Sequence, residues 1–120
     1  MTWLVTGGAG YIGAHVVAAL QQAGLDPVVL DDLSTGHREF VPDGVDLVHG
    51  NILDTTLIEE TLRGCSAAGV IHVAGYKYAG ESVSCPLHTY EQNVEGTRSV
   101  LEAMRRAEVS NIVFSSSAAV

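Results

Sequence analysis

A glycine-rich segment near the start of the chain is the feature that most constrains its fold. Residues 7–13 follow directly on the short apolar run 3–6. Their spacing matches G-x-x-G-x-x-G through Gly7, Gly10 and Gly13, and also G-x-G-x-x-G, which shares the last two glycines. Such glycines allow a tight turn, let a pyrophosphate approach the backbone, and let the next helix pack closely on the strand. The segment therefore predicts a strand, a turn and a helix whose N-terminus faces phosphate groups.

An acidic residue stands where a dinucleotide site requires one. The apolar run 27–30 ends at Asp31, eighteen residues after Gly13. An acid in this position accepts hydrogen bonds from the hydroxyls of the adenosine ribose and repels a 2′-phosphate. The pattern thus predicts binding of NAD rather than NADP. Asp32 follows directly, and two interpretations of it stay open, a contact to the coenzyme or a solvated loop acid.

Short apolar runs and helical patterns alternate along the rest of the chain. The first helix is expected to end at Gly24 and to bury one face, made of Ile12, Val16, Ala19, Leu20 and Ala23. A second helix of about ten residues is predicted from an N-cap at Asp54 to Gly64, and a third over 86–108. The loop 32–44 is expected to hold at most one helical turn. Strands are predicted at 3–6, 27–31, 45–49, 69–73 and 111–115.

Strands that alternate with helices in this way predict a parallel sheet with right-handed crossovers. The fold class is therefore α/β, a Rossmann-like doubly wound parallel sheet of five strands in the order 3-2-1-4-5. No internal repeat or linker interrupts the pattern, so we expect one dinucleotide-binding domain over residues 1–120.

Composition excludes several classes of protein. Six basic against fourteen acidic residues give a net charge of −8, which argues against nucleic acid and anionic membrane as partners. A hydrophobic share of 47% with 17% charged residues excludes intrinsic disorder, and no apolar run is long enough for a transmembrane helix. The N-terminus lacks the basic region of a signal peptide, and the two cysteines fit a reducing cytoplasm. The five histidines are dispersed, so no metal site is expected.

Motifs along the whole chain resemble those of one family. The turn 6–13 is similar to that of extended short-chain dehydrogenases/reductases. The segments 73–83, 86–97 and 114–120 resemble UDP-glucose 4-epimerases, and related nucleotide-sugar dehydratases usually differ over 77–83. The resemblance implies a UDP-hexose substrate, a resident NAD, inversion at C4 of the sugar through a 4-keto form, and a homodimer built through helices.

The resemblance also implies roles for individual residues. It assigns the NAD pyrophosphate to Gly7, Gly10, Tyr11, Ile12 and Gly13, with Tyr11 and Ile12 contributing mainly backbone. It assigns the adenosine ribose and the adjacent loop to Asp31, Asp32, Ser34, Thr35 and Gly36. Asn51 and Ile52 match a pair that is commonly an acid followed by isoleucine, so the amide oxygen of Asn51 would accept from the adenine amino group. The remaining coenzyme contacts fall on Ala74, Gly75, Lys77, Asn93 and Ser115.

Ser117 is the predicted catalytic residue, because it matches the serine that hydrogen-bonds the sugar 4-hydroxyl in the family. The family's base is a tyrosine followed four residues later by a lysine. None of the four tyrosines has a lysine at that spacing. We therefore expect the chain to be the NAD-binding front part of an epimerase, inactive as a 120-residue polypeptide. Two alternatives stay open, a non-catalytic NAD-binding module and the N-terminal part of another nucleotide-sugar epimerase or dehydratase.

Overall fold

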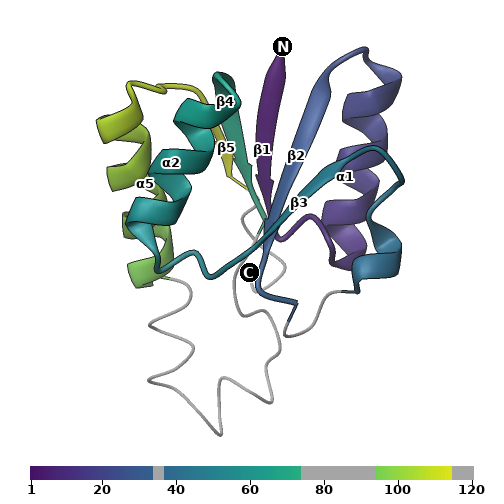
Figure 1. Cartoon of the computed structure of the whole chain (residues 1–120), viewed down its shortest axis with the longest axis horizontal. Helices are drawn as coiled ribbons and strands as arrows, with labels where there is room; N and C mark the ends of the chain where they lie inside the picture. The colour runs from purple at the N-terminus through teal and green to yellow at the C-terminus, as the bar shows by residue number, and fades with distance from the viewer. Residues whose placement is uncertain (34–36, 74–93, 115–120) are drawn as a thin grey trace, which may run out of the picture.

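The computed structural model of the chain describes residues 1–33, 37–73 and 94–114. Within these ranges five strands form one parallel sheet in the order β3-β2-β1-β4-β5. Helix α1 (Tyr11–Gln22) covers one face of the sheet, and α2 (Thr55–Gly64) and α5 (Gly96–Ala107) cover the other (Figure 1). The predicted fold class and strand order are confirmed. The strands are β1 (Thr2–Thr6), β2 (Asp26–Asp31), β3 (Asp46–His49), β4 (Ala67–His72) and β5 (Ile112–Phe114).

Alternate residues of the central strands build two separate cores. In β1, Leu4 joins the cluster under α2 and α5, whereas Val5 joins the cluster under α1. In β2, Leu30 joins the cluster under α2 and α5, and Val29 joins the cluster under α1. Because both faces of these strands are covered, they are apolar along most of their length. This double burial is the reason that the central strands could be recognised from sequence.

The expected helix boundaries are confirmed where the structure describes them. The Asp54 carboxylate accepts the N–H of Leu57 at 3.1 Å and so caps α2, which ends at Gly64. Gly24 follows α1 with φ of +79°, a conformation that glycine adopts without strain. In the described part of the loop after β2 there is one short 3₁₀ turn, η1 (Arg38–Phe40). Of the helix expected over 86–108, α5 confirms the later part, and residues 86–93 lie outside the described residues.

The buried face predicted for α1 is confirmed at Leu20 and at Val16, which packs against the core under the helix, and is wrong at the other three positions. The residues of α1 that are buried are Gly13, Val17 and Leu20. Ile12 is 46% exposed, and Ala19 and Ala23 also face solvent. The physical reason is Gly13, whose lack of a side chain lets the helix lie directly on the glycine turn. A stripe drawn through the apolar residues alone leaves this glycine out.

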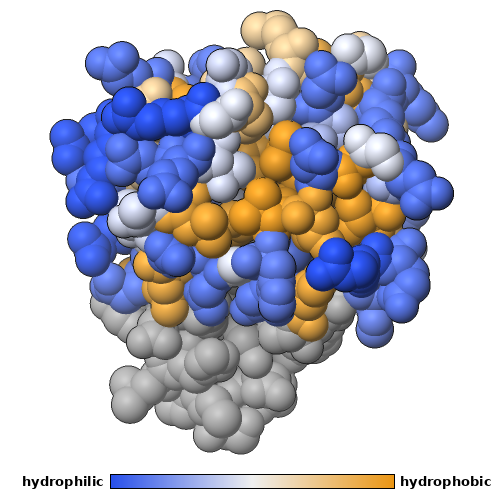
Figure 2. Space-filling view, in the orientation of Figure 1, coloured by the Kyte–Doolittle hydropathy of each residue, from blue (hydrophilic) through white to orange (hydrophobic). Residues whose placement is uncertain are grey.

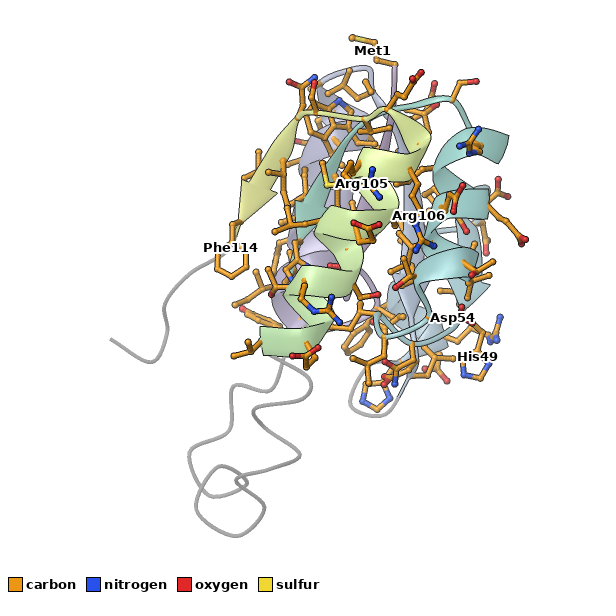
Figure 3. All side chains as sticks on the ribbon, turned by 90° about the vertical axis from the view of Figure 1, so that its left-hand side faces the viewer. Met1, His49, Asp54, Arg105, Arg106 and Phe114 are labelled. Carbon is orange, nitrogen blue, oxygen red and sulfur yellow. The ribbon has the colours of Figure 1, made fainter. Side chains whose placement is uncertain are left out.

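The two edges of the sheet differ in how far their apolar side chains are buried. Figure 2 shows a band of apolar surface across the side of the molecule where β3 runs, and Leu47 and Val48 of that strand are partly buried. At the other edge, Val113 and Phe114 of β5 are each about half exposed. Figure 3 places Phe114 at the end of β5, far from the end of the chain at Met1. In the described part of the chain, no helix is long and apolar enough to cross a membrane.

Ion pairs hold the outer faces of α2 and α5 together. Arg106 of α5 lies 3.1 Å from Glu102 on its own helix and 3.8 Å from Glu59 on α2 (Figure 3). Arg63 pairs with Glu59 at 3.1 Å and also donates to the carbonyl of Arg106. All of these side chains contact water, so each pair contributes little to stability by itself.

The pKa of Glu102 provides a test of this arrangement. Hydrogen bonding from the Arg105 guanidinium, and then from Arg106, lowers the pKa of Glu102 from 4.5 to about 2. Because the pKa is lower in the folded state, the pairing stabilises the fold above pH 4.5, and this contribution is lost as the pH falls toward 2. A carboxyl ¹³C titration by NMR should find the low pKa, and Arg105→Gln should raise it toward its ordinary value. Arg98→Gln, which removes the partner of Glu95, is the matched control and should leave Glu102 unchanged.

Candidate functional site

The glycine turn joins the end of β1 to the start of α1. Gly7 has φ of +75°, and its N–H donates to the carbonyl of Leu30 in β2 at 2.8 Å. The N–H of Gly10 then donates back to the Gly7 carbonyl at 3.1 Å, which closes the turn. A residue with a side chain would be strained at Gly7. The first predicted glycine is therefore required by the backbone conformation.

Gly13 lets α1 approach the turn at backbone distance. A Cβ built on Gly13 would overlap the carbonyl oxygen of Gly7 and lie 2.7 Å from the Cα of Gly8. Gly10 is the N-cap of the helix, with an extended backbone and no side-chain cap, and the first turn of α1 holds no acidic residue. Amide groups at such a helix start are donors that anions bind. The turn and the helix together form a cradle of backbone N–H groups.

Asp31 connects the glycine turn to the loop after β2. Its side chain is 8% exposed and accepts two backbone hydrogen bonds, from Ala9 at 3.0 Å and from Leu33 at 2.7 Å. A carboxylate has about four acceptor positions, so about two are left for a ligand. Leu33 has φ of +62°, which is costly for a residue with a side chain. The residue that donates to Asp31 at the loop side therefore has a strained backbone, and its hydrogen bond helps to hold the carboxylate beside the turn.

The end of β3 lies beside the end of β2. The N–H of Gly50 donates to the Asp31 carbonyl at 3.1 Å, and His49 Nε2 donates to the Asp32 carbonyl at 3.1 Å. Figure 3 places His49 near Asp54, at the carboxyl end of the sheet. The two predicted sites at residues 31–32 and 51–52 therefore share one edge of the molecule.

Asn51 and Ile52 both have local structural roles in addition to the predicted one. The amide oxygen of Asn51 accepts the N–H of Leu53 at 2.9 Å, so it has one acceptor position left for another partner. Ile52 is 5% exposed and belongs to the core under α2 and α5, and a Cβ added at Gly96 would overlap its side chain. Coenzyme contacts of Ile52 would thus have to come from its backbone.

Tyr11 and Ile12 point outward from the first turn of α1. The Tyr11 side chain is 76% exposed, and its ring meets the edge of the His15 ring at 4.8 Å between centroids. This agrees with the expectation that both residues offer backbone groups. The other predicted site residues lie outside the described residues, and they are Ser34, Thr35, Gly36, Ala74, Gly75, Lys77, Asn93, Ser115 and Ser117.

Sequence reasoning missed a buried polar cluster next to the turn. His72, at the end of β4, contacts Thr6 at the end of β1 and Thr97 on α5. The available signal was a polar residue at the carboxyl end of an apolar strand, the same signal that identified Asp31. Among the described residues, no group of three or more His, Cys, Asp or Glu side chains is arranged to hold a metal ion.

Comparisons with known proteins agree on one family. The model of the NAD dependent epimerase/dehydratase family matches residues 3–120. A UDP-glucose 4-epimerase of Azospirillum brasilense is 46% identical over 117 residues, which are 98% of this chain and 34% of that protein. One of Klebsiella pneumoniae is 42% identical over 127 residues, covering 100% of this chain and 91% of that sequence.

A solved structure shares both the fold and the sequence pattern. UDP-glucose-4-epimerase from Stenotrophomonas maltophila, with bound NAD and formylated UDP-arabinopyranose, superimposes with a TM-score of 0.95 at 36% identity. The match covers 98% of this chain and 37% of that one, so the chain spans about a third of these longer relatives. With the family model matched over nearly its whole length, the chain belongs to the NAD-dependent epimerase/dehydratase family.

Proposed function

We propose that residues 1–120 form an NAD-binding domain and act as the coenzyme-binding part of a UDP-glucose 4-epimerase. The observation that carries the proposal is the hydrogen bond from the Ala9 N–H to the Asp31 carboxylate. This bond holds a buried carboxylate directly beside a glycine turn and a helix N-terminus without a side-chain cap. These are the two ends of an adenosine diphosphate site in a doubly wound sheet.

The described residues carry hydrogen-bonding groups that suit the two ends of the adenosine diphosphate half of NAD. The N–H groups at the start of α1 would hold the pyrophosphate, and the close approach at Gly13 leaves them open to it. Asp31 would accept from the ribose hydroxyls through the acceptor positions that its two backbone partners leave. An anion in this position also disfavours the 2′-phosphate of NADP.

The reaction in this proposal is the interconversion of UDP-glucose and UDP-galactose. NAD, when bound, accepts a hydride from C4 of the sugar and returns it to the opposite face. Ser117 would hydrogen-bond the 4-hydroxyl, and Lys77, Asn93 and Ser115 would complete the coenzyme contacts. A crystallised relative with bound NAD and formylated UDP-arabinopyranose supports the proposed coenzyme and substrate class. Galactose metabolism, a cytoplasmic location and a homodimer formed through helices belong to the same proposal.

The proposal predicts that the chain discriminates between the two nicotinamide coenzymes. Titration calorimetry should detect NAD⁺ binding, and NADP⁺ should bind at least about tenfold more weakly because its 2′-phosphate meets the Asp31 carboxylate. Raising the salt concentration should narrow the difference in affinity between NAD⁺ and NADP⁺, since salt screens part of the repulsion between the 2′-phosphate and Asp31. Equal binding of both coenzymes, or of neither, would contradict the proposal.

A separate prediction about turnover follows because no tyrosine of the chain has a lysine four residues later. A polypeptide of these 120 residues should bind NAD⁺ but should not convert UDP-galactose to UDP-glucose, because no tyrosine in it has the partner lysine. A coupled assay for UDP-glucose tests this, with a full-length relative as the positive control. Measurable turnover would show that a different base operates. Inactivity with retained NAD binding also fits the second candidate, a non-catalytic NAD-binding module.

A further inference from the structure

A buried histidine joins three segments beside the proposed coenzyme site. His72, the last residue of β4, is 2% exposed. Its Nδ1 lies 2.7 Å from Thr6 Oγ1 at the end of β1, and its Nε2 lies 3.2 Å from Thr97 Oγ1 on α5. Thr6 Oγ1 also accepts the N–H of Val73 at 3.1 Å. The imidazole therefore bridges two neighbouring strands and the helix that covers them.

The anchors of this bridge adjoin residues that the proposed function assigns to NAD. Thr6 and Val73 directly precede Gly7 and the segment 74–77, respectively. Thr97 follows Asn93 by four residues. A displacement of Thr6 would thus move the start of the glycine turn, which is proposed to hold the pyrophosphate.

The ring also packs against the strand that leads to the proposed catalytic serine. The centroids of His72 and Phe114 are 5.5 Å apart, with the ring planes tilted by 37°. Phe114 is the last residue of β5 and directly precedes Ser115. One side chain therefore contacts the carboxyl ends of β1, β4 and β5, which is the edge where doubly wound sheets bind ligands.

A histidine in this place has a cost that an apolar residue would avoid. Burying a polar ring is unfavourable unless its nitrogens are hydrogen-bonded. A neutral imidazole provides one donor and one acceptor, and a threonine hydroxyl can act as either, so both tautomers can form the bridge. What the histidine adds over a leucine of similar size is directional bonds that fix the spacing of the strand ends.

We propose that His72 is a positioning residue for the coenzyme, acting through Thr6, whose hydroxyl also holds the Val73 N–H, on the glycine turn. The expected effect on NAD affinity rests on the proposed function. The positioning role makes a structural claim of its own as well, namely that the geometry of the glycine turn depends on the imidazole.

Three variants of the chain test the proposal. His72→Leu removes the contacts of the imidazole to Thr6 and Thr97, whereas His72→Asn keeps an acceptor near the place of Nδ1 for the Thr6 hydroxyl. Ser99→Ala is the matched control, since it breaks another hydroxyl contact of α5, the 2.6 Å pair with Thr55 on α2. Unfolding in urea measures stability, calorimetry measures the Kd for NAD⁺, and ¹H–¹⁵N spectra without NAD report on the Gly7 and Gly10 amides.

His72→Leu is expected to weaken NAD⁺ binding about tenfold and to shift the Gly7 and Gly10 amides even without coenzyme. His72→Asn should recover most of the affinity, and Ser99→Ala should lower stability with the Kd unchanged. A Kd for His72→Leu within about twofold of the wild type, or equal losses in the Leu and Asn variants, would overturn the inference.

The positioning role of His72 and the proposed function can fail separately. If the wild-type chain bound no NAD⁺, the proposed function would fail, and unshifted glycine amides in His72→Leu would then reject the positioning role independently. If His72→Leu did not fold, Thr97→Val would replace it, because it removes the hydroxyl that contacts Nε2 and keeps the side-chain shape. About a threefold loss of affinity is expected for that variant, and no loss would contradict the proposal.

Discussion

Gly13→Ala is expected to destabilise the chain by about 3 kcal/mol and to abolish measurable NAD⁺ binding. The added methyl group would overlap the carbonyl oxygen of Gly7 and press on the Cα of Gly8. Both contacts are with backbone, so no side chain can rotate away, and α1 must move off the turn. The helix N-terminus moves with it, and the cradle of N–H groups loses its geometry. Urea unfolding and calorimetry with NAD⁺ measure the two effects.

Two other glycines make this prediction specific. Gly64→Ala, at the end of α2, places a Cβ where no atom lies within 4 Å, and alanine favours helix, so stability should be unchanged or slightly higher. Gly10→Ala places a Cβ 3.5 Å from the Gly7 carbonyl oxygen, which is an ordinary contact. That variant should fold. It should bind NAD⁺ about tenfold more weakly than the wild type, because the added methyl group lies between the backbone and the pyrophosphate. Wild-type stability in Gly13→Ala would disprove the packing argument.

The features of the fold that were predicted from sequence are those set by neighbouring residues. The cap at Asp54, the stop at Gly24 and the apolar strands all follow from a few adjacent side chains. The strand order also followed, because regular alternation of strands and helices leaves few right-handed arrangements. The same logic identified Asp31, since the end of the second strand is fixed once the first turn is recognised.

The features that were missed depend on contacts that the pattern of apolar residues does not show. Thr6 and His72 are 66 residues apart, and no local pattern connects them. The stripe of α1 was partly misplaced because its first buried residue is Gly13, which packs without any apolar side chain. Asn51 was assigned a ligand contact alone, whereas its amide oxygen also caps the N–H of Leu53. In each case the deciding partner is a backbone atom or a distant polar group.

Asp31→Asn is expected to weaken NAD⁺ binding about 100-fold, equivalent to about 2.7 kcal/mol. The amide keeps one acceptor oxygen, so its NH₂ group must face the N–H of either Ala9 or Leu33. The loss of one buried hydrogen bond should also cost about 1–3 kcal/mol of stability. Because the anion that repels a 2′-phosphate is gone, NADP⁺ should lose much less affinity than NAD⁺, and the preference between them should nearly vanish.

Asp26→Asn is the matched control, because Asp26 begins the strand that Asp31 ends. Its side chain is exposed, so the same change of charge at the opposite end of β2 should alter stability by less than about 0.5 kcal/mol. The affinities for both coenzymes should stay at the wild-type values. If both variants weakened NAD⁺ binding equally, the loss would not depend on the place of the carboxylate beside the glycine turn. If only Asp31→Asn did, the carboxylate beside the glycine turn would be the group that selects the coenzyme.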